Sequence, residues 1–270
     1  MAKTKKSGGG ILELIKTLVY ALLLAGVIRT FLFQPFWIPS GSMKETLLIG
    51  DFLFVNKFAY GYSAASCPSY GDFNLCGAFE EKEGRLFGST PERGDVIVFK
   101  HPVTGEDYIK RLIGLPGDMI DVRDGQIILN GTPVPQVPDG EFIETYAQQG
   151  PVRSLPRCLR DAPVGLGGDC AKTRAIETLP EGRSYPVLDI GITSADTRGP
   201  FEVPEGQFFF MGDNRDNSID SRFPQVRNGV GLVPFENLIG RADRIMFSSA
   251  GSSILYFWTW RGDRFFRAVN

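Results

Sequence analysis

The chain has 270 residues, of which 43% are hydrophobic and 22% are charged, so it can bury the core of one large domain or two modest ones. Its formal net charge of −2 gives no general attraction for polyanions, which excludes nucleic-acid binding driven by electrostatics. The 32 glycines, 18 prolines and 21 phenylalanines are spread among short Val/Ile/Phe runs and predict a turn-rich β protein.

An apolar segment at residues 11–33 follows a basic tail at residues 1–10, and we expect it to form one transmembrane helix. About 20 helical residues match the thickness of a bilayer's hydrocarbon core, and the charged residues of the segment lie near its ends. A cleaved signal peptide has a similar charge pattern, but no clean Ala-x-Ala site follows, so we favour a retained anchor. The positive-inside rule then keeps the basic tail cytoplasmic and places everything after Thr30 on the far side of the membrane.

The motif Pro39-Ser40-Gly41-Ser42-Met43 lies directly behind this anchor and could present a serine nucleophile at the membrane surface. Pro39 favours an extended entry into the turn, and Gly41 lets another backbone approach closely. These features suit an exposed nucleophile beside an oxyanion donor, although an ordinary surface turn has the same composition. Trp37 belongs to a residue type that prefers the headgroup region, so we expect Ser42 close to the bilayer surface.

Short runs of β-forming residues separated by turn signals follow the serine motif and predict antiparallel β structure. Residues 34–135 and 201–270 are assigned to one barrel-like β domain, with a loop insertion at residues 62–94 and an inserted subdomain at residues 136–200. Strands or hairpins are expected at residues 47–57, 95–100, 107–115, 120–130, 207–211 and 238–248.

Four cysteines fall into two local pairs, Cys67 with Cys76 and Cys158 with Cys170, and each pair encloses a loop rich in Gly and Pro. Neither pair is followed by histidines at the spacing of a zinc site, so two disulfides and an oxidising compartment fit best. Four unrelated reduced thiols are the alternative, because an even count fixes no connectivity.

Adjacent charges at Lys110 and Arg111 point to opposite faces if this segment is a strand, so we expect one of them to face the interior. Only Lys110 could act as a base, because arginine does not lose its proton in a protein. A useful base at neutral pH needs a lysine pKa roughly 2 to 3 units below its usual value of about 10.4, which desolvation can supply. The alternative is an edge strand with both charges solvated.

The single histidine, His101, offers a rival base that would act on Ser42 together with one of the aspartates. His101 precedes Pro102 at an expected hairpin turn, where an exposed histidine is common. We therefore favour Lys110 as the partner of Ser42.

A polar run at residues 212–222 follows the apolar strand expected at residues 207–211. It is only superficially similar to an EF-hand loop, because Arg215 occupies the third place counted from Asp213, where calcium needs an oxygen donor. We expect a turn held by Asx hydrogen bonds and Asp/Arg pairs rather than a metal site. The hydroxyl of Ser218 could orient a neutral lysine amine.

An aromatic cluster lies near the end of the chain, at Tyr256-Phe257-Trp258-Thr259-Trp260 with Phe265 and Phe266. It is too short and too closely flanked by charges to span a membrane. A core strand and an interfacial patch are both consistent with this pattern.

Five segments together resemble the conserved boxes of bacterial type I signal peptidases, and they occur in that family's order: residues 39–43, 47–51, 93–99, 110–118 and 212–222. The resemblance implies an endopeptidase of the bacterial cytoplasmic membrane with a Ser/Lys dyad and an all-β catalytic region. Such an enzyme cleaves signal peptides from exported preproteins after small residues, at sites of the Ala-x-Ala type, and needs no metal or cofactor.

The same resemblance assigns roles by position. Ser42 matches the nucleophile, Lys110 the general base, and Ser40 the hydroxyl that helps the Ser42 N–H bind the oxyanion. The serine that positions the lysine, with its supporting pair, corresponds to Ser218, Asp220 and Arg222. Substrates are expected to bind as an extended strand between two segments, made of Phe36, Trp37, Ile38 and Pro39 on one side and Asp107, Tyr108 and Ile109 on the other.

The sequence departs from the family at Glu45, where a proline is common, in having one evident span where some members have two, and in its cysteine-bearing loops. These departures concern loop geometry and topology more than chemistry.

Two other functions stay open. One is a Ser/Lys relative that cleaves itself or one dedicated partner, as the self-cleaving SOS repressors do, although those repressors carry a DNA-binding domain that is lacking here. The other is an anchored, non-enzymatic β domain that serves as an envelope binding or scaffold module.

Overall fold

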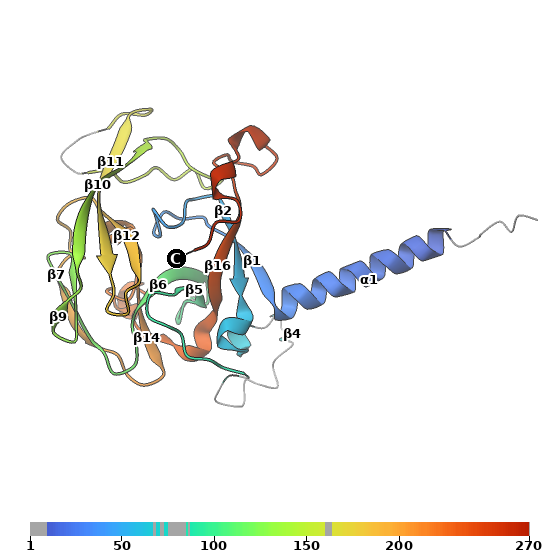
Figure 1. Ribbon diagram of the computed structural model, residues 1–270, viewed down its shortest axis with the longest axis horizontal. Helices are drawn as coiled ribbons and strands as arrows, with labels where there is room; N and C mark the ends of the chain where they lie inside the picture. Colours follow the sequence, from blue (N-terminus) through green and yellow to red (C-terminus); the bar gives the residue numbers. More distant parts are fainter. Residues whose placement is uncertain are drawn as a thin grey trace, which may run out of the picture.

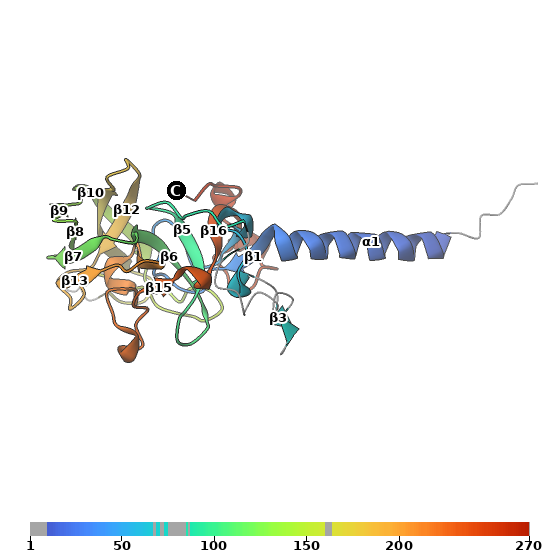
Figure 2. The same cartoon turned by 90° about the horizontal axis from the view of Figure 1, so that it is seen from below.

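The computed structural model describes residues 10–66, 69–70, 73–74, 85, 87–159 and 164–269. Its first element, helix α1 (Gly10–Phe31), extends away from a body made of strands, as two perpendicular views show (Figures 1 and 2). The window Gly10–Val27 is long and apolar enough to cross a membrane and is not covered by the rest of the protein. The predicted N-terminal apolar helix is therefore present.

A seven-stranded sheet with the order β1-β2-β16-β5-β6-β14-β15 forms the part of the body next to α1 (Figure 1). Every neighbouring pair in it is antiparallel. Buried residues alternate with half-buried ones along β2, as expected for a strand with one face on the core. The strands are β1 (Phe33–Trp37), β2 (Asp51–Asn56), β5 (Val96–Lys100), β6 (Asp107–Gly114), β14 (Gln207–Met211), β15 (Val233–Pro234) and β16 (Leu238–Ser248).

The remaining strands form smaller antiparallel sheets. One has the order β13-β7-β8-β9, with β7 (Met119–Arg123), β8 (Gln126–Leu129), β9 (Thr132–Pro133) and β13 (Arg198–Glu202). Another consists of β10 (Gln136–Thr145), β11 (Asp169–Thr178) and β12 (Ser184–Asp189), and both lie at the end of the body away from α1 (Figures 1 and 2). A short pair joins β3 (Ser69–Tyr70) to β4 (Phe73–Asn74). The predicted mainly β, antiparallel fold class is thus confirmed.

The hairpin between β7 and β8 shows how the sequence sets a turn. Asp124 and Gly125 occupy its two central positions with φ values of 48° and 78°. A two-residue hairpin loop needs positive φ at both positions, which Asp and Gly tolerate better than other residues. Short 3-10 helices lie at Lys57–Tyr60, Ala64–Ser66, Arg215–Asn217, Gln225–Arg227, Phe235–Asn237, Phe257–Thr259 and Gly262–Arg264.

One apolar cluster brings the start of the chain's β region to the middle of the large sheet. Ile38 and Met43 are buried in it with strand residues of β2, β5 and β16, and Phe36 and Ile109 pack against its edge. The end of β1 and the middle of β6 are four places apart in the sheet order, yet they share this core. The cluster therefore holds the segment after β1 against the segment that contains Lys110.

Cys158 and Cys170 form a disulfide with an S–S distance of 2.04 Å, so the second predicted pair is confirmed. Cys67 and Cys76 lie outside the described residues. The C-terminal aromatic cluster is not a core strand, since the side chains of Phe257 and Trp258 are 66% and 69% exposed.

Candidate active site

Ser42 and Lys110 meet although 68 residues separate them in the chain. Ser42 lies in the turn that follows β1, and Lys110 lies in β6, where Lys110 Nζ is 2.6 Å from Ser42 Oγ. The amine also donates to the carbonyl of Ile109 at 3.0 Å. Both side chains are buried, with relative exposures of 6% and 4%. An amine and a hydroxyl at this distance can exchange a proton directly.

Burial changes the acidity of this amine. It lowers the pKa of Lys110 to about 8, and the positive charge of Arg222 acts in the same direction, while the carboxylates of Asp220 and Asp213 oppose the change. With that pKa, about one amine in ten is neutral at pH 7, compared with about one in a few thousand for an ordinary lysine. Lys110 can therefore accept a proton at neutral pH.

The neighbouring charge, Arg111, is fully buried as well, so the expectation that only one of the two residues faces the interior is wrong. Its guanidinium donates to both carboxylate oxygens of Asp213, at 2.8 and 2.7 Å, and lies 3.9 Å from the ring centre of Tyr185. The two faces of β6 are thus both covered. An arginine survives burial here because its charge is fully paired, whereas Lys110 has no carboxylate within hydrogen-bond distance in the described chain.

Asn214 anchors the nucleophile turn, and its role was not predicted from the sequence. Its backbone N–H donates to the Ser42 carbonyl at 3.0 Å, and its Nδ2 donates to the Gly41 carbonyl at 2.8 Å. Gly212 lies beneath the same turn, and a Cβ placed there would be 2.6 Å from the Ser42 carbonyl oxygen and 2.3 Å from Ser218 Oγ. Only glycine fits at position 212, because the Ser42 backbone approaches it closely.

Ser40 lies at the open side of the pair. Its Oγ is 3.4 Å from Ser42 Oγ, and its side chain is exposed.

The polar run at residues 212–222 contains the other residues predicted for the site, Ser218, Asp220 and Arg222. The Ser218 hydroxyl is buried and forms no hydrogen bond to Lys110 in the described part of the protein. Asp220 and Arg222 do form the predicted ion pair, with distances of 2.8 and 2.9 Å, and Asp220 also accepts from the Gly212 N–H at 3.1 Å.

Two strand edges flank the pair. On one side, β1 is the outermost strand of the seven-stranded sheet and leads through Ile38 and Pro39 to the nucleophile turn. On the other, β6 pairs with β14 only from Arg111 onward, so residues 107–110 have no strand partner on that side in the described chain. Of the predicted substrate-binding residues, Ile38 is buried, Phe36, Trp37, Tyr108 and Ile109 are half-buried, and Pro39 and Asp107 are exposed.

His101 is not the exposed turn residue that the sequence suggested. Its ring is 2% exposed and packs 4.9 Å from Tyr108, and its Nδ1 accepts the backbone N–H groups of Val103 and Thr104 at 3.1 and 3.2 Å. A ring nitrogen that accepts two N–H donors holds its turn together. Ser42 is not among the partners of His101.

Carboxylates of Asp189, Asp196 and Asp216 gather within 4.8 Å of one another. The backbone N–H of Thr193 donates to Asp196 and its hydroxyl donates to Asp216, and the N–H groups of Ile190 and Gly191 donate to Asp216 and Asp189. Of these three carboxylates only Asp216 belongs to the polar run at residues 212–222.

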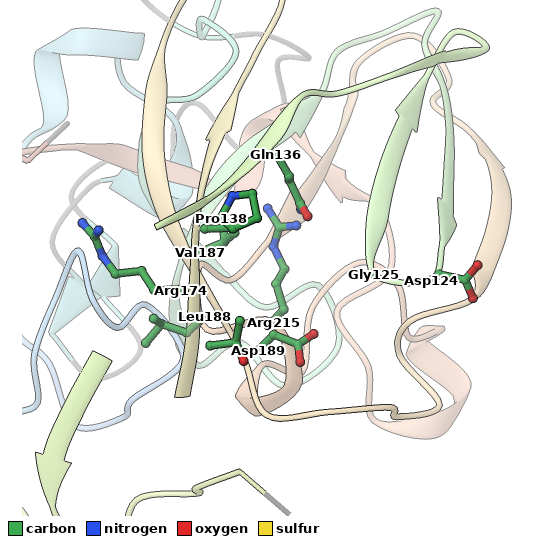
Figure 3. A pocket seen from close by; sticks show the side chains of 11 residues that line it. Asp124, Gly125, Gln136, Pro138, Arg174, Val187, Leu188, Asp189 and Arg215 are labelled. Atoms are coloured by element: carbon green, nitrogen blue, oxygen red, sulfur yellow. The ribbon is translucent and has the colours of Figure 1, made fainter. Parts of the chain in front are cut away.

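A cavity of about 250 Å³ lies between the β10–β12 sheet and the β7–β8 hairpin (Figure 3). Arg215 and Gln136 both line it, and both donate to Glu177. Neither Ser42 nor Lys110 belongs to its lining, so this cavity is separate from the Ser/Lys pair.

Comparison with known proteins identifies the family. Residues 11–247 match the family described as signal peptidase, peptidase S26. The chain belongs to this family. The signal peptidase I of Rickettsia typhi is 39% identical over 240 residues, covering 85% of this chain and 78% of the relative. That of Rickettsia canadensis is 37% identical over 244 residues, covering 87% and 79%.

A crystal structure of a signal peptidase I from Enterococcus faecalis matches 57% of this chain and 97% of its own, with 25% identity and a TM-score of 0.29. The family membership confirms the resemblance drawn from the five sequence segments. The protein is therefore a peptidase of the S26 type, which removes the non-enzymatic envelope module from consideration.

Proposed function

We propose that this protein removes N-terminal signal peptides from exported preproteins, with Ser42 as the nucleophile and Lys110 as the general base. The observation that carries the proposal is the 2.6 Å contact between Lys110 Nζ and Ser42 Oγ in a buried setting that lowers the lysine pKa to about 8. The relatives named signal peptidase I support the choice of substrate.

The reaction follows from this contact. Neutral Lys110 takes the proton of the Ser42 hydroxyl while Oγ attacks the carbonyl carbon of the scissile peptide bond. The resulting ammonium returns the proton to the leaving amine as the C–N bond breaks, which leaves an acyl ester on Ser42. Lys110 then takes a proton from water as the water oxygen attacks the ester carbonyl. The bond between that carbon and Ser42 Oγ breaks, Lys110 returns the proton to Oγ, and the signal peptide leaves with a free carboxyl end.

Charge develops on the scissile carbonyl oxygen during both attacks. Ser40 Oγ, exposed beside Ser42 Oγ, is suited to donate to that oxygen together with the Ser42 N–H. Asn214 supports this arrangement because it fixes the carbonyls on both sides of the Ser42 N–H. The pair formed by Asp220 and Arg222 shapes the run that carries Ser218.

The free edges of β1 and β6 support binding of the substrate as an added strand. Main-chain groups of residues 36–40 and 107–110 would then hold an extended peptide with its scissile bond over Ser42. Backbone pairing is indifferent to side chains, so specificity has to come from pockets beneath alternate residues. We extend the proposal to cleavage after small residues, at sites of the Ala-x-Ala type.

Helix α1 supports a location in the bacterial cytoplasmic membrane, as a single-pass anchor with its basic N-terminus in the cytoplasm. The Cys158–Cys170 disulfide supports an oxidising compartment for the β body. This orientation puts the Ser/Lys pair on the same side of the membrane as the translocated preprotein.

The test is cleavage of a preprotein with an Ala-x-Ala site by the full chain in phosphatidylcholine nanodiscs. Ser42→Ala and Lys110→Met should each lower kcat by about 10⁴ or more, because the two groups act as one unit. Ser252→Ala, which changes an exposed serine, serves as the matched control and should cleave at the wild-type rate. Cleavage within tenfold of wild type by either dyad variant would refute the mechanism.

A further inference from the structure

A second cavity, of about 330 Å³, opens next to the nucleophile turn, and neither Ser42 nor Lys110 lines it. Lys44, two residues after Ser42, forms one wall, and its aliphatic carbons lie 3.3 to 3.5 Å from where a Cβ on Gly41 would be. Ile49 and Phe142 provide apolar surface to the cavity. Its polar lining includes Glu144, Gln149 and Arg261.

Positive charge exceeds negative charge around this cavity. Lys44 Nζ donates to Glu144 at 2.6 Å and to Gln149 at 2.7 Å, and Lys172 donates to the other oxygen of Glu144. Three cations, counting Arg261, therefore face one carboxylate. Exposed Asp263 lies near Arg261, and Asp51 is already paired with Arg264, so an excess of positive charge stays after both are counted.

Arg261 has hydrogen-bonding capacity to spare. Its Nη1 donates to the Ile49 carbonyl at 2.9 Å and to Ser248 Oγ at 3.1 Å, which fixes the guanidinium in place. Its Nε and Nη2 have no acceptor among the described residues. These two groups form the edge of a guanidinium that binds carboxylate or phosphate with two parallel hydrogen bonds.

Burial makes the cationic groups that line this cavity more acidic than usual. Burial lowers the pKa of Lys44, and Lys172 and Arg261 lower it further, despite the opposing effect of Glu144. Burial likewise lowers the pKa of Arg261. A bound anion would relieve this repulsion.

The position of the cavity favours phosphate over other anions. Ala250 and Arg261 line the cavity and form the base of a hairpin, where Ala250 N–H donates to Thr259 and Arg261 N–H to Ser248. The tip of that hairpin exposes Leu255, Phe257 and Trp258 at 79%, 66% and 69%. Aromatic side chains of this kind prefer the headgroup level of a bilayer, where phosphates are concentrated.

We infer that this cavity is a binding site for a phosphate oxyanion, held by the free edge of Arg261 with Lys44 as the second cation. The phosphate comes either from a lipid headgroup or from solution, and both have the same recognition chemistry. The site is distinct from the Ser/Lys pair, and its occupancy is measurable without any cleavage.

The first experiment titrates inorganic phosphate, in the millimolar range, into the full chain in phosphatidylcholine nanodiscs and follows heat of binding and melting temperature. Wild type should bind. Arg261→Gln should bind about tenfold more weakly or worse, because it loses two charge-assisted hydrogen bonds. Arg261→Lys keeps the charge without the fork and should be intermediate, and Arg227→Gln, which removes an exposed arginine, should match wild type.

The second experiment identifies the source of the phosphate. A rise in melting temperature on adding phosphatidylglycerol to the nanodiscs, present in wild type and Arg227→Gln but absent in Arg261→Gln, assigns the cavity to a lipid headgroup. A rise with inorganic phosphate alone assigns it to free phosphate. The inference is overturned if neither probe stabilises wild type, or if Arg261→Gln binds as tightly as wild type. Failure of both probes, with a raised KM of Arg261→Gln for preproteins that carry acidic residues after the cleavage site, would instead make the cavity a substrate subsite.

Discussion

Replacement of Lys110 by methionine removes the amine but keeps an unbranched apolar side chain that suits the site. In the wild type, burial lowers the pKa of Lys110 from about 10.4 to about 8. One pKa unit corresponds to about 1.4 kcal/mol, so burial disfavours the charged amine by about 3 kcal/mol. Lys110→Met should abolish cleavage and relieve this penalty at neutral pH.

The pH dependence of stability gives the cleaner measurement. Between pH 8 and about 10.4, the unfolded chain keeps the Lys110 proton while the folded chain has lost it, so the free energy of unfolding rises with pH. Below pH 8 both states are protonated, and the penalty is fully present. The free energy of unfolding of wild type minus that of Lys110→Met should therefore increase by about 3 kcal/mol from pH 7 to above 10.4. Urea titrations of the two proteins at each pH measure this difference, in which the other titrating groups cancel.

The same amine should govern activity. Because the neutral form is the base, kcat/KM of the wild type should rise with pH and level off above an apparent pKa near 8. The reasoning fails if kcat/KM keeps rising to pH 10 or beyond, or if the stability difference between wild type and Lys110→Met is flat across this range. Either result would mean that Lys110 is charged and hydrated in the folded protein.

Three further substitutions test other parts of the site. Ser40→Ala should lower kcat by about 10² to 10³ with little change in KM, as expected for the loss of one oxyanion donor, in steady-state cleavage assays. His101→Ala should keep kcat/KM within a fewfold of wild type but lower the free energy of unfolding by about 1 to 3 kcal/mol, because the buried ring and its two hydrogen bonds to backbone N–H groups are lost. Gly212→Ala should abolish cleavage because its Cβ has no room, whereas Gly165→Ala, with nothing within 4 Å, should behave as wild type.

Local sequence rules predicted the elements that depend on neighbours in the chain. The apolar helix and the Asp124-Gly125 hairpin follow from hydrophobic patterning and turn chemistry. The argument that only lysine can lose its proton singled out Lys110 before any geometry was known. These predictions needed no knowledge of the tertiary packing.

Burial on both faces of β6 could not be predicted in this way. A strand with one solvated face would leave either Lys110 or Arg111 in water, and the sequence offered no sign that a second layer covers the other face. That layer comes from Tyr185 and Asp213, which lie 74 and 102 residues away from Arg111. For the same reason His101 was expected at the surface, since its burial against Tyr108 depends on how β5 and β6 pair.

The nucleophile turn shows why the departure at Glu45 leaves the site intact. Lys44 and Glu45 are neighbours, and each forms an ion pair with the three-stranded sheet: Lys44 with Glu144 of β10 at 2.6 Å, and Glu45 with Arg174 of β11 at 2.6 Å. A proline stiffens a turn by restricting its own backbone, whereas these pairs restrain it from outside. The pair at Lys44 is nearly buried and the pair at Glu45 is partly exposed, so removal of one partner should destabilise the turn more at Lys44 than at Glu45. Strands β10 and β11 therefore do more than extend the fold, because they hold the residues next to Ser42 in position.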